Sequence, residues 1–247
     1  MPPTAERRLL VVADVQTGYH HDSISMALAT LVTLGRATGR FATTVRTDSQ
    51  LITRDPILGQ GAKYGGKRVN ARNLHDFDAL FMLPSGSGTL SLAQKADLLA
   101  FVEQDGKGLI AGHAALVGFF DWPAFGALLG ARLGGEIDRP AQVRVDDPGF
   151  PGALAFGPGP FTFAEQHPVL APPYVADDVH VVLRLDPETV APGERGHRAD
   201  GDYPVVWTRQ PGAGRVVNVA WGHHAETWED PRFQALVLGA IAWAMGG

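Results

Sequence analysis

The sequence predicts an α/β fold with a mainly parallel sheet that is covered by helices on both faces. In the first half of the chain, short apolar runs alternate with segments of helical periodicity. The first run, residues 9–13, is apolar at every position, which is typical of a strand buried on both faces of a parallel sheet. Repeated alternation of strands and helices favours parallel pairing. The composition agrees, because 45% hydrophobic and 19% charged residues are an ordinary globular balance.

Four strands and the helices between them are expected in the first half. Residues 23–39 carry apolar side chains at helical spacing and end at a glycine, which predicts a helix after the first strand. The segment Ser91-Leu92-Ala93-Gln94 has the pattern of a capping box, so a second helix is expected to begin there and to end near Asp105-Gly106. The remaining strands of this half are expected at residues 41–46, 79–83 and 109–111.

The second half predicts extra strands and long loops. Glycine and proline are dense in residues 147–173, which favours loops over a surface. The last helix is expected at residues 231–245, and Gly212-Ala213-Gly214 is expected to form a turn between the last two strands. No repeat or linker-like segment interrupts the chain, so we expect one domain over residues 1–247. Short strands are expected at residues 142–145, 179–185, 205–208 and 216–220.

Composition also excludes several classes of site and partner. The chain has no cysteine, which removes disulfides and thiolate metal sites. The net charge is −5 and no run rich in lysine and arginine occurs, so we expect neither nucleic acid nor a membrane as partner. No apolar run is long enough to span a bilayer, and residues 1–8 lack the pattern of a signal peptide, so a cytoplasmic protein is expected. The sequence is compatible with a homo-oligomer.

His113 occupies the position at which a nucleophile would be expected. Residues 107–116 have the pattern of a buried strand, a tight turn and the start of a helix, with small residues on both sides of His113. Such an elbow projects its turn residue above the end of a parallel sheet, and in acyl transfer that residue is Ser or Cys. Neither stands here, so thiolate attack from the elbow is excluded. We predict a functional His113; a hydrogen-bonded structural histidine is the alternative.

Polar residues follow other expected strands as well. Ligands of open α/β sheets bind outside the carboxyl ends of the strands, where these loops would meet. We therefore predict that His21, His113 and His223 line one pocket, with Glu165 at its rim. The alternatives are that His20 and His21 cap the following helix and that Glu165 is a solvated carboxylate. The other candidates are Tyr19 after the first strand, Ser87 in a glycine-rich loop without P-loop spacing, and Trp221, His224 and Glu226 after the last strand.

Several segments together resemble the ThuA-like, trehalose-utilization family from the first strand to Trp243. They are His21-Asp22-Ser23-Ile24, Gly112-His113-Ala114-Ala115, the run 125–131, Pro204-Val205-Val206-Trp207, the ending 214–224 and the last helix. The resemblance implies a class I glutamine amidotransferase-like fold and hence a flavodoxin-like sheet. It also implies a role in the breakdown of trehalose, related disaccharides or 3-keto sugars.

The resemblance separates this chain from the glutaminases of the same fold. Those enzymes place Cys at the elbow and a His-x-Glu triplet after a late strand. Here the elbow holds His113, while His224-Ala225-Glu226 keeps the triplet spacing, so ammonia production is excluded. Glu165 resembles the acidic motif of the family, although Ala164 stands where the family has Asp. The resemblance puts four residues in the polar cleft: His21, His113, Glu165 and His223.

Two classes of function follow. In the first, the protein is an enzyme, a hydrolase, lyase or isomerase, that acts on a sugar derivative. His113, Glu165 and His223 would be catalytic, and a neutral imidazole at His113 would take a proton from a ring carbon or a hydroxyl. A metal variant has a divalent ion such as Zn²⁺ held by the four cleft residues. Substrate contacts would come from His21, Tyr19, Ser87, Trp221, His224 and Glu226.

In the second class, the same cleft binds a carbohydrate without turnover, as a sensor or assembly partner. In both classes the partner is a small-molecule sugar. The sequence alone identifies neither the sugar nor the metal.

Overall fold

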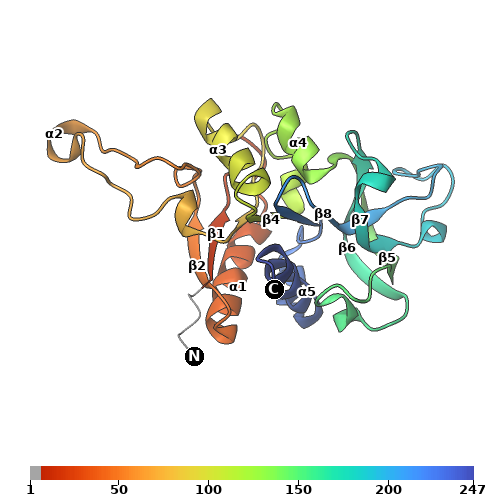
Figure 1. Cartoon of the computed structure of the whole chain (residues 1–247). Helices are drawn as coiled ribbons and strands as arrows, with labels where there is room; N and C mark the ends of the chain where they lie inside the picture. Colours follow the sequence, from red (N-terminus) through yellow and green to blue (C-terminus); the bar gives the residue numbers. More distant parts are fainter. Residues whose placement is uncertain (1–6) are drawn as a thin grey trace.

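The computed structural model describes residues 7–247, whose nine strands form one mixed sheet in the order β2-β1-β3-β4-β9-β8-β7-β5-β6 (Figure 1). Five strands pair in parallel: β2 (Ala42–Arg46), β1 (Arg8–Val12), β3 (Ala79–Met82), β4 (Gly108–Gly112) and β9 (Arg215–Val219). Four more continue the sheet with antiparallel pairing: β8 (Pro204–Arg209), β7 (His180–Leu185), β5 (Arg132–Val145) and β6 (Phe161–Ala171). The expected α/β class is confirmed, but parallel pairing is confined to one half of the sheet.

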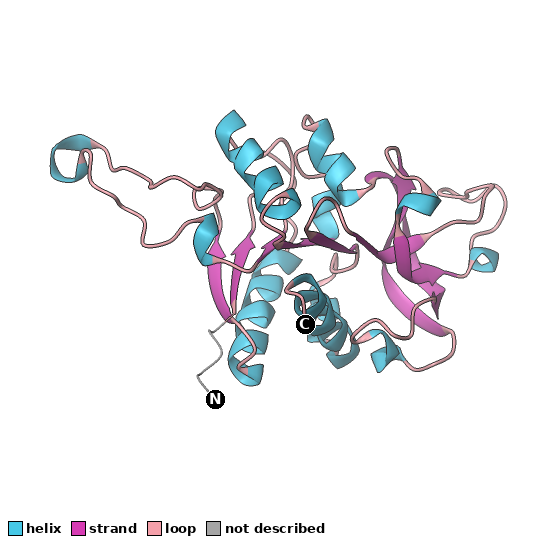
Figure 2. Ribbon diagram, viewed as in Figure 1, coloured by secondary structure: helices cyan, strands magenta, loops and turns pink. Residues whose placement is uncertain are grey.

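Helices cover both faces of the parallel half, as expected. Figure 2 shows α1 (Ser23–Thr38) and α5 (Pro231–Ala244) on one face, and α3 (Leu92–Glu103) and α4 (Pro123–Leu129) on the other. Alternate residues of β1 pack into the two layers, because one cluster contains Leu9 and Val11 and the other contains Leu10 and Val12. An uninterrupted apolar strand is thus required by burial on both sides.

The helix termini follow the local sequence signals. Ser91 begins α3 with the expected capping box, in which its hydroxyl accepts from the backbone N–H of Gln94 while the Gln94 side chain accepts from the N–H of Ser91. Gly39 ends α1 in the left-handed conformation, with φ 62°. Asp22 occupies the N-cap position of α1, but its side chain makes no capping hydrogen bond there.

The antiparallel half corrects two expectations. Residues 147–173 are not mainly loop, because they contain the 11-residue strand β6. The short strand expected at 142–145 is the end of the 14-residue β5. Gly134, Gly135 and Pro140 concealed β5, and Pro168 concealed β6. These residues are tolerated because β6 is an edge strand and β5 pairs with β7 only through residues 143–145, so that backbone groups on the free side need no partner.

The elbow after β4 is present, with one difference from the expectation. His113 directly follows β4 and begins a one-turn 3₁₀ helix, His113–Leu116, in place of an α-helix. A turn at the carboxyl end of a buried central strand places this side chain at the edge where ligands bind to α/β sheets. Across residues 7–247, no helix has the length and apolar character needed to cross a membrane.

Candidate functional site: a three-histidine cluster

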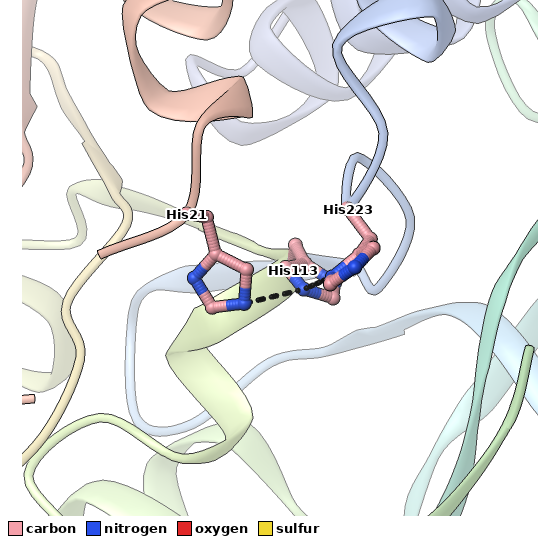
Figure 3. Close-up of side chains that lie close together, drawn as sticks. All are labelled: His21, His113 and His223. Atoms are coloured by element: carbon pink, nitrogen blue, oxygen red, sulfur yellow. Dashed lines mark hydrogen bonds between the residues drawn. The ribbon is translucent and has the colours of Figure 1, made fainter. Parts of the chain in front are cut away.

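Three histidines from segments far apart in the sequence meet at the carboxyl end of the parallel strands. His113 follows β4, His223 follows β9, and His21 precedes α1 in the loop after β1. Because β1, β4 and β9 run in the same direction, their carboxyl ends share one edge of the sheet. The predicted convergence of these three side chains is present (Figure 3). We call them the three-histidine cluster.

His113 lies at the centre of the cluster. Its Nε2 is 3.2 Å from Nε2 of His21 and 3.1 Å from Nδ1 of His223. Its Nδ1 lies 3.4 Å from the carbonyl oxygen of Ala220, to which only a protonated nitrogen can donate. Nε2 of a neutral His113 therefore carries one in-plane lone pair. That single lone pair cannot accept good hydrogen bonds from both neighbouring rings.

Burial keeps His21 and His113 uncharged. Desolvation, followed by the neighbouring rings of His21 and His223, lowers the pKa of His113 to about 3. Desolvation and His223 lower the pKa of His21 to about 4, against a small opposing effect of Asp22. Both imidazoles are thus neutral at physiological pH, which is the form that binds a metal. A pKa near 3 also makes His113 a weak general base, since an effective base has a pKa near the working pH.

The donor set fits a divalent transition metal. One nitrogen from each ring of the three-histidine cluster can be chosen so that all three lie within 4.8 Å of one another. Imidazole suits Zn²⁺ and similar ions, and three protein ligands leave a position open for water or substrate. The carbonyl of Ala220 fixes the tautomer of His113, as outer-shell partners do for metal-bound histidines. Nδ1 of His21 is buried without a hydrogen-bond partner in residues 7–247, so its ring is less firmly oriented.

The cluster forms part of the wall of a cavity of about 440 Å³. Apolar side chains line much of the remainder, and two polar residues, Glu136 and Gln166, reach it from β5 and β6. Neither of these two side chains has a hydrogen-bond or ion-pair partner within the described chain. The cavity thus combines potential metal ligands with free polar groups and an apolar surface. Its lining residues are Tyr19, His21, His113, Ala114, Leu116, Val117, Leu133, Glu136, Gln166, Pro168, Ala220 and His223.

Glu165 does not lie at the rim of the cavity, where it was expected. It is 1% exposed and accepts hydrogen bonds from the backbone N–H groups of Gly222 and His223 and from the hydroxyl of Thr227. It is also absent from the group of potential metal ligands. Glu165 therefore holds the loop that carries His223.

The remaining predicted residues divide between the cavity and the rest of the fold. Tyr19 lines the cavity, is 70% exposed, and packs edge-on against His21 with ring centroids 4.8 Å apart. Trp221 is fully buried and donates from Nε1 to Nδ1 of His167, so it belongs to the core. Ser87 does not line the cavity.

The triplet His224-Ala225-Glu226 does not face the elbow. His224 lies outside the cavity, with Nε2 3.3 Å from a carboxylate oxygen of Asp138, and Glu226 is exposed. The histidine that contacts His113 is His223, the residue before the triplet. The spacing shared with glutaminases therefore does not recreate their catalytic pair.

Glu136 and Gln166 were missed by the sequence reasoning. In the β5–β6 ladder Glu136 lies opposite Pro168, and Asp138 lies opposite Gln166, so these four residues share one face of the hairpin. The available signal was the alternation of Glu136 and Asp138 around the buried Ile137. The neighbouring glycines and proline hid it.

The chain is similar to known proteins over nearly its full length. A family described as ThuA, trehalose utilisation, matches residues 8–244. A ThuA-like protein from Bacteroides uniformis has a similar structure, with TM-score 0.71 and 20% identity over 97% of this chain and 91% of that one. A ThuA-like protein from Parabacteroides merdae follows with TM-score 0.69 and 15% identity over 99% and 91%.

Part of a β-galactosidase from Bacillus circulans has the same fold, with TM-score 0.56 and 11% identity over 96% of this chain and 31% of that one. At these identities the structural likeness shows the fold alone. Among curated proteins, no relative matches this chain.

Proposed function

This chain belongs to the ThuA family, and on that premise we propose that it is an enzyme of carbohydrate breakdown whose cavity holds a divalent metal ion on His21, His113 and His223. The proposed substrate is a trehalose-like disaccharide or its 3-keto derivative. The observation that carries the proposal is the approach of two ring nitrogens to Nε2 of His113, at 3.2 and 3.1 Å, while its Nδ1 is engaged by Ala220. One lone pair cannot serve two donors, whereas a shared cation accommodates three lone pairs.

The low pKa of His113 favours the metal over the general-base variant. A group with a pKa of about 3 is a poor base at neutral pH, but it is an available ligand. Among the cavity-lining residues, Glu136 is the carboxylate and is free of partners within the described chain. We therefore assign proton transfer to Glu136 and metal binding to the three-histidine cluster.

The cavity walls suit a sugar. A sugar presents hydroxyl groups at its edges and C–H groups on its faces. Glu136 and Gln166 offer free acceptors, and in Gln166 also donors, for hydroxyl groups. Leu116, Leu133 and Pro168 offer apolar surface for the C–H face.

The chain's own residues have distinct tasks in this proposal. A bound divalent ion would polarise a carbonyl or hydroxyl oxygen of the sugar. With a keto sugar, Glu136 would accept the proton from the carbon next to the carbonyl, which makes elimination or isomerisation feasible. Glu165 would keep His223 in place by holding the backbone of its loop.

The strand order supports the fold that the resemblance implied. The parallel half runs β2-β1-β3-β4-β9, which corresponds to the flavodoxin-like order when β9 is taken as the fifth strand. Within that fold a histidine at the elbow in place of Cys is consistent with a protein that is not a glutaminase.

The test joins metal analysis with turnover. Protein purified without a polyhistidine tag is analysed by elemental mass spectrometry and assayed on trehalose and 3-keto-trehalose before and after chelation. We expect about one divalent ion per chain and turnover that chelation removes and the ion restores. A metal-free protein that is fully active would overturn the metal assignment. Binding of either sugar without turnover would favour the sensor alternative.

A further inference from the structure

A long segment between β2 and β3 projects away from the body of the protein. Figure 1 shows it extending from the β2 edge of the sheet, with the short helix α2 (Gly61–Tyr64) at its tip. We call residues 54–72 the arm. Figure 2 shows that no other element of the described chain covers its tip.

The arm is an ordered structure. At its root, the N–H of Leu74 donates to the carbonyl of Thr53, and the Asn73 side chain donates to the carbonyl of Arg54. Further out, the two sides pair with each other, since the N–H of Val69 donates to the carbonyl of Ile57 at 2.8 Å. An antiparallel bridge between Leu58 and Arg68 continues this pairing.

The arm nevertheless lacks a core of its own. Residues 61–69 are all exposed. Leu58, Tyr64 and Val69 are each about half exposed, at 54%, 50% and 49%. An isolated two-stranded ribbon is only marginally stable in water, because it has no third layer to bury its side chains. A hydrogen-bonded ribbon with exposed apolar residues is typical of a segment that docks on another surface.

The charge of the arm differs in sign from that of the body. The arm has one acidic residue and five basic ones, a net charge of +4, in a chain of net charge −5, so the rest of the chain carries −9. Of the five basic residues, Arg54 pairs with Asp105 of the body, and the other four form no ion pair within residues 7–247. These four are Lys63, Lys67, Arg68 and Arg72.

We propose that the arm docks on the body of a second copy of this chain, so that two copies exchange arms. The arm has a net charge of +4 and the rest of the chain a net charge of −9, and each copy carries both, so two copies can make two equivalent contacts, as a closed symmetric dimer requires. The same charges disfavour a nucleic acid or an anionic membrane, because a body of net charge −9 would repel it.

The first test measures mass by light scattering across the micromolar range. We expect a particle of twice the chain mass of 26.3 kDa. The charge-reversal variant Lys63→Glu/Lys67→Glu/Arg68→Glu should raise the dissociation constant of the dimer on the order of tenfold or more, and added salt should weaken the wild-type dimer. The matched control reverses three exposed arginines of the body that form no ion pair in residues 7–247, namely Arg36, Arg40 and Arg195.

The second test locates the arm. Because the chain has no cysteine, Ala62→Cys at the exposed tip supplies a single site for a photo-reactive maleimide. We expect crosslinks between chains, from the tip to peptides of the body. The proposal would be overturned by any one of three results: a monomeric wild type, an unchanged dissociation constant in the charge-reversal variant, or crosslinks that stay within one chain. A monomer that binds duplex DNA or anionic vesicles through the arm would also overturn it.

Discussion

The two halves of the sheet contribute different parts of the candidate site. The parallel half, β2-β1-β3-β4-β9, carries the three-histidine cluster on loops at its carboxyl edge. The antiparallel half, β8-β7-β5-β6, adds Glu136 and Gln166 to the cavity and Glu165 behind it. The potential metal ligands thus come from the half whose strand ends converge, whereas the antiparallel half contributes cavity residues from one face of the β5–β6 hairpin. The division predicts which substitutions affect the metal, the reaction or the fold.

The largest effect is expected for His113→Ala. This change removes the central nitrogen of the cluster, so we expect metal content and turnover of the proposed sugar substrate to fall by more than the ~10–100-fold that loss of an outer-shell partner typically costs. Elemental analysis and turnover are measured beside thermal melting. His20→Ala is the matched control, because His20 is exposed and does not line the cavity. Full metal content and full turnover in the His113 variant would break the assignment of chemistry to the parallel half.

Glu136→Gln tests the contribution of the other half. If Glu136 moves a proton, its loss should lower kcat on the order of 10²–10⁴-fold while metal content and melting temperature stay unchanged. Asp138→Asn is the control, since Asp138 lies on the same face of the hairpin but pairs with His224 outside the cavity. An unchanged kcat would leave the antiparallel half with no part in the chemistry.

The same division explains what the sequence could predict. The central parallel strands β1, β3 and β4 are almost entirely apolar because both of their faces are covered, and His21, His113 and His223 follow strands whose ends share an edge. Both facts have a local signal. In the β5–β6 hairpin, the strand pattern is obscured by Gly134, Gly135, Pro140 and Pro168. These residues are acceptable because of their position in the sheet, which local sequence propensity does not reveal.

Residues whose place depends on that hairpin were therefore misjudged. Glu165 was expected to be exposed at a rim, yet β6 buries it against the loop of His223. Trp221 was proposed as a substrate contact, and the same strand buries it against His167. Side chains of these types are compatible with either environment, and only the register of β6 decides between them.

The substitution Glu165→Gln is expected to weaken the hydrogen bonds between β6, in the antiparallel half, and the loop that carries His223, in the parallel half. The carboxylate accepts hydrogen bonds from Gly222, His223 and Thr227, and an amide would turn an N–H group toward one of these donors. We expect metal affinity to fall about 10–100-fold and stability to fall by roughly 1–3 kcal/mol. Metal titration and denaturant unfolding measure the two effects, with the exposed Glu226→Gln as control. Unchanged metal affinity in a destabilised variant would reduce Glu165 to a purely structural residue.

The smallest expected effect concerns stability at acidic pH. It involves His167, which connects the two halves of the sheet. His167 of β6 is fully buried, donates from Nε2 to the carbonyl of Arg139, and accepts at Nδ1 from Nε1 of Trp221. Burial lowers its pKa from 6.5 to about 4, so the folded state keeps it neutral where the unfolded chain binds a proton. The contribution of neutral His167 to the free energy of unfolding is therefore complete above about pH 6.5, and it is lost as the pH falls toward 4.

His167→Gln isolates this contribution, because an amide can donate to Arg139 and accept from Trp221 without titrating. His21 and His113 also have lowered pKa values, but they titrate in both proteins and cancel in the comparison. Between pH 7 and about pH 5, wild type should lose on the order of 2 kcal/mol more unfolding free energy than the variant. Denaturant unfolding at the two pH values measures the difference, and equal losses would show that His167 does not make the junction of the two halves sensitive to acid.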